Sequence, residues 1–161
     1  MPPERESNAT GYTSLSSTLW RLREVLDQLL FKVFETRLVL ASGQGKWLAK
    51  ASRELDAALQ ELRHVEVLRA VEAIAIADQL ALPPDLTLAQ VARVAPPPWD
   101  TIFAEHRDAL RELAADLDHA TSEIPPPPAD TSQHDEIDIV GRFLVETLAN
   151  APQASLTAFL A

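Results

Sequence analysis

The stretch VEAIAIADQLALPP, residues 71–84, decides the fold because apolar residues lie on nearly every side of it. At about 100° per residue, one apolar stripe runs from Leu48 to Val65 and continues through Ile76 and Leu80. A second stripe lies on roughly the opposite side and begins only after residue 65; its members are Val67, Leu68, Val71, Ile74 and Leu82. We therefore expect a helix over about residues 46–82, with one partner along its length and a second partner beside its C-terminal half.

The first partner is expected immediately upstream. Residues 42–45, SGQG, hold two of the four glycines and predict a chain reversal. Residues 14–41 before it have apolar residues at alternating spacings of four and three, which predicts a helix with a near-antiparallel neighbour. This seam consists of Leu15, Leu19, Leu22, Leu26, Leu29, Val33, Thr36 and Leu40. It is widened by Trp20, Leu30, Phe31, Phe34 and Leu38, which indicates more than one neighbour. Residues 1–13 lack an apolar period and are expected to form a flexible tail.

The second partner is expected downstream. Thr87-Leu-Ala-Gln90 is a capping-box pattern that predicts a short connecting helix over residues 88–94. A long helix is expected over about residues 98–123, and its seam comprises Trp99, Phe103, His106, Leu110, Leu113, Leu117, Ala120 and Ile124. The chain direction makes this helix antiparallel to the one before it. We therefore expect it to cover Val71 and Ile74, and to leave Glu61 and His64 more exposed.

A proline-rich spacer separates this bundle, residues 14–124, from the tail. The segment IPPPPADTSQ cannot be helical, so residues 125–134 are interpreted as a semi-rigid linker and residues 135–161 as a C-terminal helix and tail. One face of the tail helix is apolar and offers partner-binding candidates, namely Ile137, Val140, Phe143, Leu144 and Leu148. Packing on the bundle and capture of another protein's helix both remain open. The spacer predicts that truncation after Glu123 leaves the bundle folded.

Composition excludes several functional classes. The chain of 161 residues has a formal net charge of −10 and no local cluster of Lys and Arg, which argues against nucleic acid as a partner. It has no cysteine, and no uncharged apolar run long enough to insert into a membrane. Residues 1–18 lack the pattern of a secretory signal, so a cytoplasmic location is expected.

The sequence contains little that would support catalysis or the binding of a cofactor. Glu61-x-x-His64 and Asp116-x-x-His119 have the spacing of di-iron ligands, but Glu61 and His64 point away from the seam, whereas such ligands project into a bundle. His106 lies in the seam, where a lone histidine is typical of a partly covered core residue. There is no phosphate-binding loop and no nucleophile motif. We expect no catalytic residue, no metal and no cofactor.

A set of short motifs in a fixed order resembles the FlgN-type flagellar export chaperones. The motifs are Lys46-Trp-Leu-Ala, Glu66-Val-Leu-Arg-Ala-Val-Glu72, Leu82-Pro-Pro, Thr87-Leu, Ala95-Pro-Pro-Pro-Trp99 and Glu105-His-Arg107, and the resemblance covers roughly residues 15–120. It implies a non-enzymatic cytosolic chaperone that binds the C-terminal segments of flagellar hook-associated proteins, prevents their premature assembly and delivers them to the export apparatus. The four prolines from Pro125 to Pro128 depart from the family pattern, so no family binding residue is carried onto residues 125–161.

The sequence thus predicts an all-α fold, an antiparallel three-helix, coiled-coil-like bundle with a short connecting helix and a tethered C-terminal amphipathic helix. The alternatives to an export chaperone are a generic helical adaptor or dimerisation module and, less favoured, a di-metal helical bundle. The oligomeric state and the client are not determined by the sequence.

Overall fold

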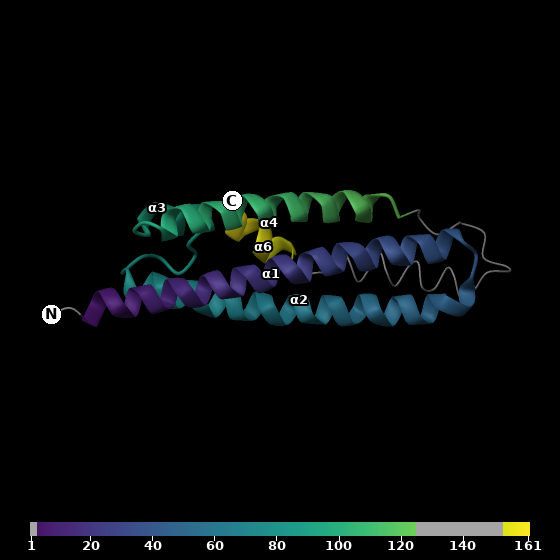
Figure 1. The fold of residues 1–161 in the computed structure, drawn as a ribbon, viewed down its shortest axis with the longest axis horizontal. Coiled ribbons are helices and arrows are strands. Elements are labelled where there is room, and N and C mark those ends of the chain that lie inside the picture. Colours follow the sequence, from purple (N-terminus) through teal and green to yellow (C-terminus); the bar gives the residue numbers. More distant parts are fainter. Residues whose placement is uncertain (1–2, 125–152) are drawn as a thin grey trace. The chain divides into compact units, whose positions relative to one another are not determined.

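The computed structural model describes residues 3–124 and 153–161, and within these ranges the regular structure is helical with no strand (Figure 1). The prediction of an all-α fold is confirmed. The helices are α1 (Pro3–Ala41), α2 (Gly45–Gln79), α3 (Leu88–Val94), α4 (Trp99–Ser122) and α6 (Gln153–Leu160). The described residues form two compact units. Unit 1 contains residues 3–24, 63–112 and 153–161, and unit 2 contains residues 25–62 and 113–124.

Helix α1 begins at Pro3, so the prediction of a loose segment is wrong for residues 3–13. Tyr12 is buried, with its ring 6.0 Å from that of Trp99 and 5.8 Å from that of Phe103. A Cβ on Gly11 would lie 3.2 Å from Gln79 Oε1, so the glycine lets α1 approach α2 closely. Tertiary packing therefore stabilises a helical turn that local propensity alone does not favour.

Helices α1 and α2 form an antiparallel hairpin around Gly43, whose φ of 66° is easy only for glycine. In unit 1, Ser14 Oγ donates to Glu72 Oε1, and in unit 2, Lys32 Nζ donates to Glu54 Oε2. The two partners in each pair lie equally far from Gly43 along the chain, as an antiparallel hairpin requires. The predicted seam of α1 is confirmed, since seven of its members are buried: Leu15, Leu19, Leu22, Leu26, Leu29, Val33 and Thr36.

Helix α2 ends at Gln79, three residues before the predicted end at Leu82. Ala81 has a φ of 53°, and its N–H donates to the Asp78 carbonyl at 3.2 Å. The Leu82 N–H donates to the Ala77 carbonyl at 2.9 Å. These are the two hydrogen bonds of a Schellman motif, in which a left-handed residue ends the helix and glycine is the usual choice. This motif ends α2 before Pro83 and Pro84, the helix-breaking residues that follow the predicted end at Leu82.

The short helix and the long helix after it match the prediction. Thr87 and Gln90 form both hydrogen bonds of a capping box at the start of α3. Helix α4 spans Trp99–Ser122 and buries five members of its predicted seam: Phe103, His106, Leu110, Leu117 and Ala120.

Coverage of the second α2 stripe by α4 is contradicted. Val71 is 60% exposed and Ile74 is 44% exposed. The ring contacts of α4 in unit 1 are made with α1, because Phe103 contacts Tyr12 and the His106 ring lies 5.1 Å from that of Trp20. Periodicity located the second apolar stripe correctly, but it could not show which of two neighbours α4 would pack against.

Candidate partner-binding surface

The tail residues proposed from the sequence as partner contacts lie outside the described residues. They are Ile137, Val140, Phe143, Leu144 and Leu148, and the spacer of residues 125–134 lies outside them as well. Any surface for a partner in the described part of the chain must therefore be identified from the exposed side chains of α1, α2 and α4.

Within unit 1, helix α2 has apolar side chains on an exposed face as well as on its buried face. Four aliphatic side chains are exposed on one face, and we call them the aliphatic stripe: Val67, Leu68, Val71 and Ile74. The charged residues of the same turns are turned away from this face. Glu66 and Arg69 are buried, and Glu72 accepts a hydrogen bond from Ser14 of α1. A contiguous apolar face of this kind on a surface helix is typical of an interaction site.

The inward charges form a buried ion pair. Arg69 Nε donates to Glu66 Oε1 at 3.0 Å, and both side chains are 5% exposed. Burial raises the pKa of the Glu66 carboxyl, although the nearby Arg69 guanidinium acts in the opposite direction. A buried ion pair is costly to desolvate and is retained only where hydrogen bonds satisfy it. The Glu66–Arg69 ion pair is therefore part of the interior of unit 1.

Helix α6 covers the same ion pair. The Arg69 guanidinium lies 4.1 Å from the centre of the Phe159 ring, and Arg69 Nη2 donates to Ser155 Oγ at 3.2 Å. Leu156, Phe159 and Leu160 are buried, and α6 also contacts α3. The last residues of the chain are thus part of the core of unit 1. This packing argues against the prediction that the bundle stays folded after truncation at Glu123, because the truncation removes these buried residues.

In unit 2, α1 presents a second exposed apolar set, which we call the aromatic stripe: Phe31, Phe34 and Leu38. The sequence analysis assigned these residues to the packed seam, but they are 62%, 48% and 71% exposed. Lys32 Nζ lies 5.4 Å from the Phe31 ring centre, and the Arg37 guanidinium lies 5.5 Å from the Phe34 ring centre. A cationic side chain therefore lies near each of the two rings, and the cation–π attraction contributes to the stability of these exposed positions.

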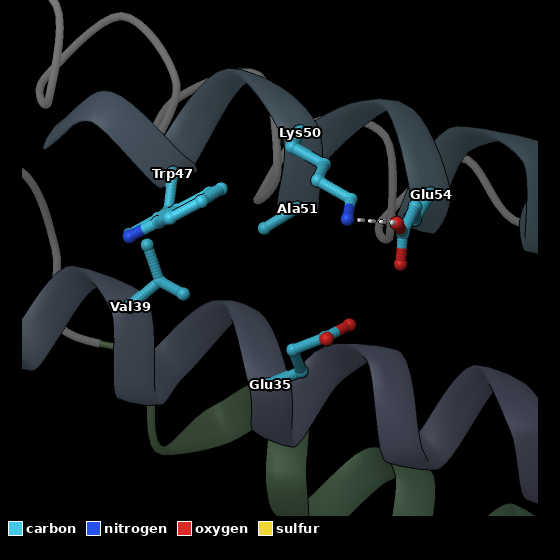
Figure 2. A pocket seen from close by; sticks show the side chains of 6 residues that line it. All are labelled: Glu35, Val39, Trp47, Lys50, Ala51 and Glu54. Carbon is cyan, nitrogen blue, oxygen red and sulfur yellow. Dashed lines mark ion pairs between the residues drawn. The ribbon is translucent and has the colours of Figure 1, made fainter. Parts of the chain in front are cut away.

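A shallow groove lies beside the α1–α2 turn in unit 2 (Figure 2). Its lining comes from both helices and comprises Glu35, Val39, Trp47, Lys50, Ala51 and Glu54. Lys32 contacts both Glu35 and Glu54, and Lys50 contacts Glu54, so the two carboxylates are already paired. Hydrogen bonding to these carboxylates raises the pKa of Lys32, and hydrogen bonding to Lys32 lowers the pKa of Glu54. A catalytic acid or base needs a pKa near the operating pH, and the pKa of the Glu54 carboxyl is shifted away from neutral pH.

The histidines named as candidates from the sequence do not form a common site in the structure. His64 and His119 are exposed, and in the described part of the chain no group of three or more His, Asp or Glu side chains could hold a metal ion. His106 is buried, with its Nε2 atom 3.1 Å from Ser16 Oγ. Burial and the charge of Arg23 lower the pKa of His106 to about 4. Its imidazole is therefore neutral near pH 7 and belongs to the core.

Among residues 3–124 and 153–161, no helix is sufficiently long and apolar to cross a membrane. Outside the aliphatic and aromatic stripes, Trp20 of α1 and Trp47 of α2 are also exposed.

The sequence analysis located the aliphatic stripe but assigned it to the core. Glu66 and Arg69 lie on the opposite side of the helix, where charged residues would be expected to face solvent. Their burial as an ion pair depends on tertiary packing, so the sequence carried no signal that the stripe is the exposed side.

Exposed apolar stripes of this kind are typical of proteins that bind other proteins. The family model described as FlgN protein matches residues 11–124, so the chain belongs to the FlgN family. This is a family of flagellar export chaperones, as the resemblance predicted. A search of curated proteins and a search of solved structures each gave no significant match.

Proposed function

We propose that this protein is a cytoplasmic export chaperone that binds the C-terminal segments of flagellar hook-associated proteins. It prevents their premature assembly and delivers them to the export apparatus. The match of the FlgN family model to residues 11–124 carries this proposal. Exposed apolar side chains on α1 and α2 support it, because a chaperone of this kind needs surfaces that engage amphipathic segments.

The client contacts in this proposal are the apolar residues of the tail helix: Ile137, Val140, Phe143, Leu144 and Leu148. Their spacing suits a helix that lies in a groove or pairs with another amphipathic helix. Large apolar anchors usually contribute most of the binding free energy in such contacts, so Phe143 is the principal anchor and Leu144 the second.

The test is an affinity measurement between full-length variants and the purified C-terminal segment of each hook-associated protein. Phe143→Ala combined with Leu144→Ala should weaken binding by at least about tenfold, since each anchor contributes on the order of 1–2 kcal/mol. Arg142→Ala is the matched control, because it lies on the opposite face of the same predicted helix. Unchanged affinity of the double variant would place the client site elsewhere. Equal binding of unrelated amphipathic helices would favour a generic helical adaptor.

A further inference from the structure

The end of the α1–α2 hairpin in unit 2 is basic, although the chain as a whole is acidic. Residues 31–54, which turn at Gly43, contain five Lys or Arg and two Glu, whereas the rest of the chain contains nine Lys or Arg and 22 Asp or Glu. These cations are spread along the sequence, and the fold brings them together. Lys32 of α1 and Lys50 of α2 contact the same carboxylate, that of Glu54.

The carboxylates of this region are already paired with cations. Lys32 contacts both Glu35 and Glu54, and Arg37 Nη1 lies 2.7 Å from Glu123 Oε2. These pairs neutralise the acidic groups of the hairpin end. The other cations of the segment are therefore in excess.

The excess cations lie along one side of α2. Lys46, Lys50 and Arg53 follow one another at spacings of four and three residues, and all three are exposed. The Lys50 side chain is 63% exposed and reaches Glu54 only at 3.8 Å. Lys46 Nζ lies 5.2 Å from the centre of the Trp47 ring.

Large apolar side chains border these cations. Figure 2 shows Trp47 of α2 beside Val39 of α1 at the groove that joins the two helices. On α1, Phe31 and Leu38 lie within about 60° of Glu35, which lines the same groove. Trp47, Phe31 and Leu38 are all exposed. The cations and these apolar residues together form one surface, which we call the hairpin patch: Phe31, Leu38, Lys46, Trp47, Lys50 and Arg53.

We propose that the hairpin patch binds the surface of a membrane that contains anionic lipids. Lysine and arginine side chains attract anionic headgroups, and exposed Trp, Phe and Leu side chains enter the boundary between headgroups and acyl chains. The contact is peripheral and requires no membrane-spanning helix. This inference goes beyond the proposed chaperone function and does not depend on which client the protein binds.

The composition of the patch favours a lipid surface over an acidic protein helix. The groove is shallow, so it does not enclose a helix, and the apolar side chains project from two helices on either side of it. Aromatic rings and cations at the same level are typical of residues at a membrane–water interface. The acidic remainder of the chain is repelled by an anionic surface, so the hairpin end should approach the membrane first.

Flotation of the full chain with lipid vesicles tests the proposal. The protein should float with vesicles of phosphatidylcholine containing about 30% phosphatidylglycerol, and it should dissociate when NaCl is raised from about 0.1 to 0.5 M. It should not float with vesicles of phosphatidylcholine alone. Absence of binding to the anionic vesicles would overturn the proposal and leave an acidic protein as the occupant, and equal binding to both kinds of vesicle would also overturn it.

Charge reversal tests whether the patch is the binding surface. Lys46→Glu combined with Lys50→Glu should weaken vesicle binding at least about tenfold, because each cation near an anionic surface contributes about fivefold in affinity. Arg63→Glu combined with Arg111→Glu is the matched control, because it changes the net charge equally at exposed positions of unit 1. The control should bind within about twofold of wild type. Circular dichroism checks that both variants stay helical. Equal weakening by the two pairs would refute the hairpin patch as the binding surface.

Tryptophan fluorescence tests which side chains enter the headgroup region. Emission of the wild-type protein should shift to shorter wavelength when the anionic vesicles are added, because Trp47 leaves water. The shift should be lost in Trp47→Phe and retained in Trp20→Phe, which removes another exposed tryptophan. A shift that persists in Trp47→Phe would place the contact elsewhere on the protein and contradict the proposal.

Discussion

At the scale of single residues, the buried His106 makes the stability of unit 1 depend on pH. Its pKa is lowered from 6.5 to about 4, so the folded state favours the neutral imidazole. The contribution of the neutral form is fully present above about pH 6.5 and is lost as the pH falls from 6.5 towards 4. At 1.36 kcal/mol per pKa unit, this amounts to about 2.5 kcal/mol between pH 7.5 and 4.5.

Urea unfolding of the wild type and of His106→Leu at both pH values measures this term. The difference in unfolding free energy between the two proteins should become less favourable to the wild type by about 2.5 kcal/mol at the lower pH. Comparing the two proteins cancels the titration of Glu66 and of other groups that they share. His64→Leu, at an exposed position, is the control. A pH-independent difference would show that His106 does not titrate between the folded and unfolded states as described.

Ala81 is a second residue whose conformation has a measurable consequence. A non-glycine residue in the left-handed region costs about 1–2 kcal/mol, while glycine loses about 0.5–1 kcal/mol more conformational entropy on folding. Ala81→Gly should therefore stabilise the protein by roughly 0.5–1 kcal/mol, measured as a rise in the free energy of unfolding. Ala57→Gly, at an exposed position inside α2, should instead destabilise it by about 1 kcal/mol. A loss of stability from both changes would argue against the Schellman motif.

At the scale of elements, α6 should be required for the stability of unit 1. Phe159 is 4% exposed and stacks on the buried Arg69, so Phe159→Ala should cost about 3 kcal/mol or more in unfolding free energy. Thr157→Ala, on the exposed side of the same helix, should change the unfolding free energy by less than about 0.5 kcal/mol. Wild-type stability in Phe159→Ala would mean that α6 is not part of the core in solution.

The elements also show what the sequence could and could not predict. The spacing from Leu15 to Thr36 and the capping box at Thr87 predicted helices correctly, because both signals depend on neighbours within one helix. The environments of Val71 and Phe34 were predicted wrongly, because exposure depends on where another helix packs. The role of α6 was missed for the same reason, since its partner Arg69 lies far away in the sequence.

At the scale of the whole molecule, family membership and the exposed apolar surfaces both support the proposed chaperone function. The FlgN match extends over residues 11–124, which contain both the aliphatic and the aromatic stripe. The proposed tail anchors lie beyond the matched segment. Their role in client binding is therefore proposed from the apolar periodicity of residues 135–149.

The most direct test of this account is co-purification of the tagged full-length protein with each hook-associated protein expressed in the same cells. The account predicts a stable complex with at least one full-length client, and loss of that complex when the client's C-terminal amphipathic segment is removed. Unrelated helical proteins of similar size should not co-purify. Absence of any complex with the hook-associated proteins, or a complex that persists without the client's C-terminal segment, would contradict the proposed chaperone function.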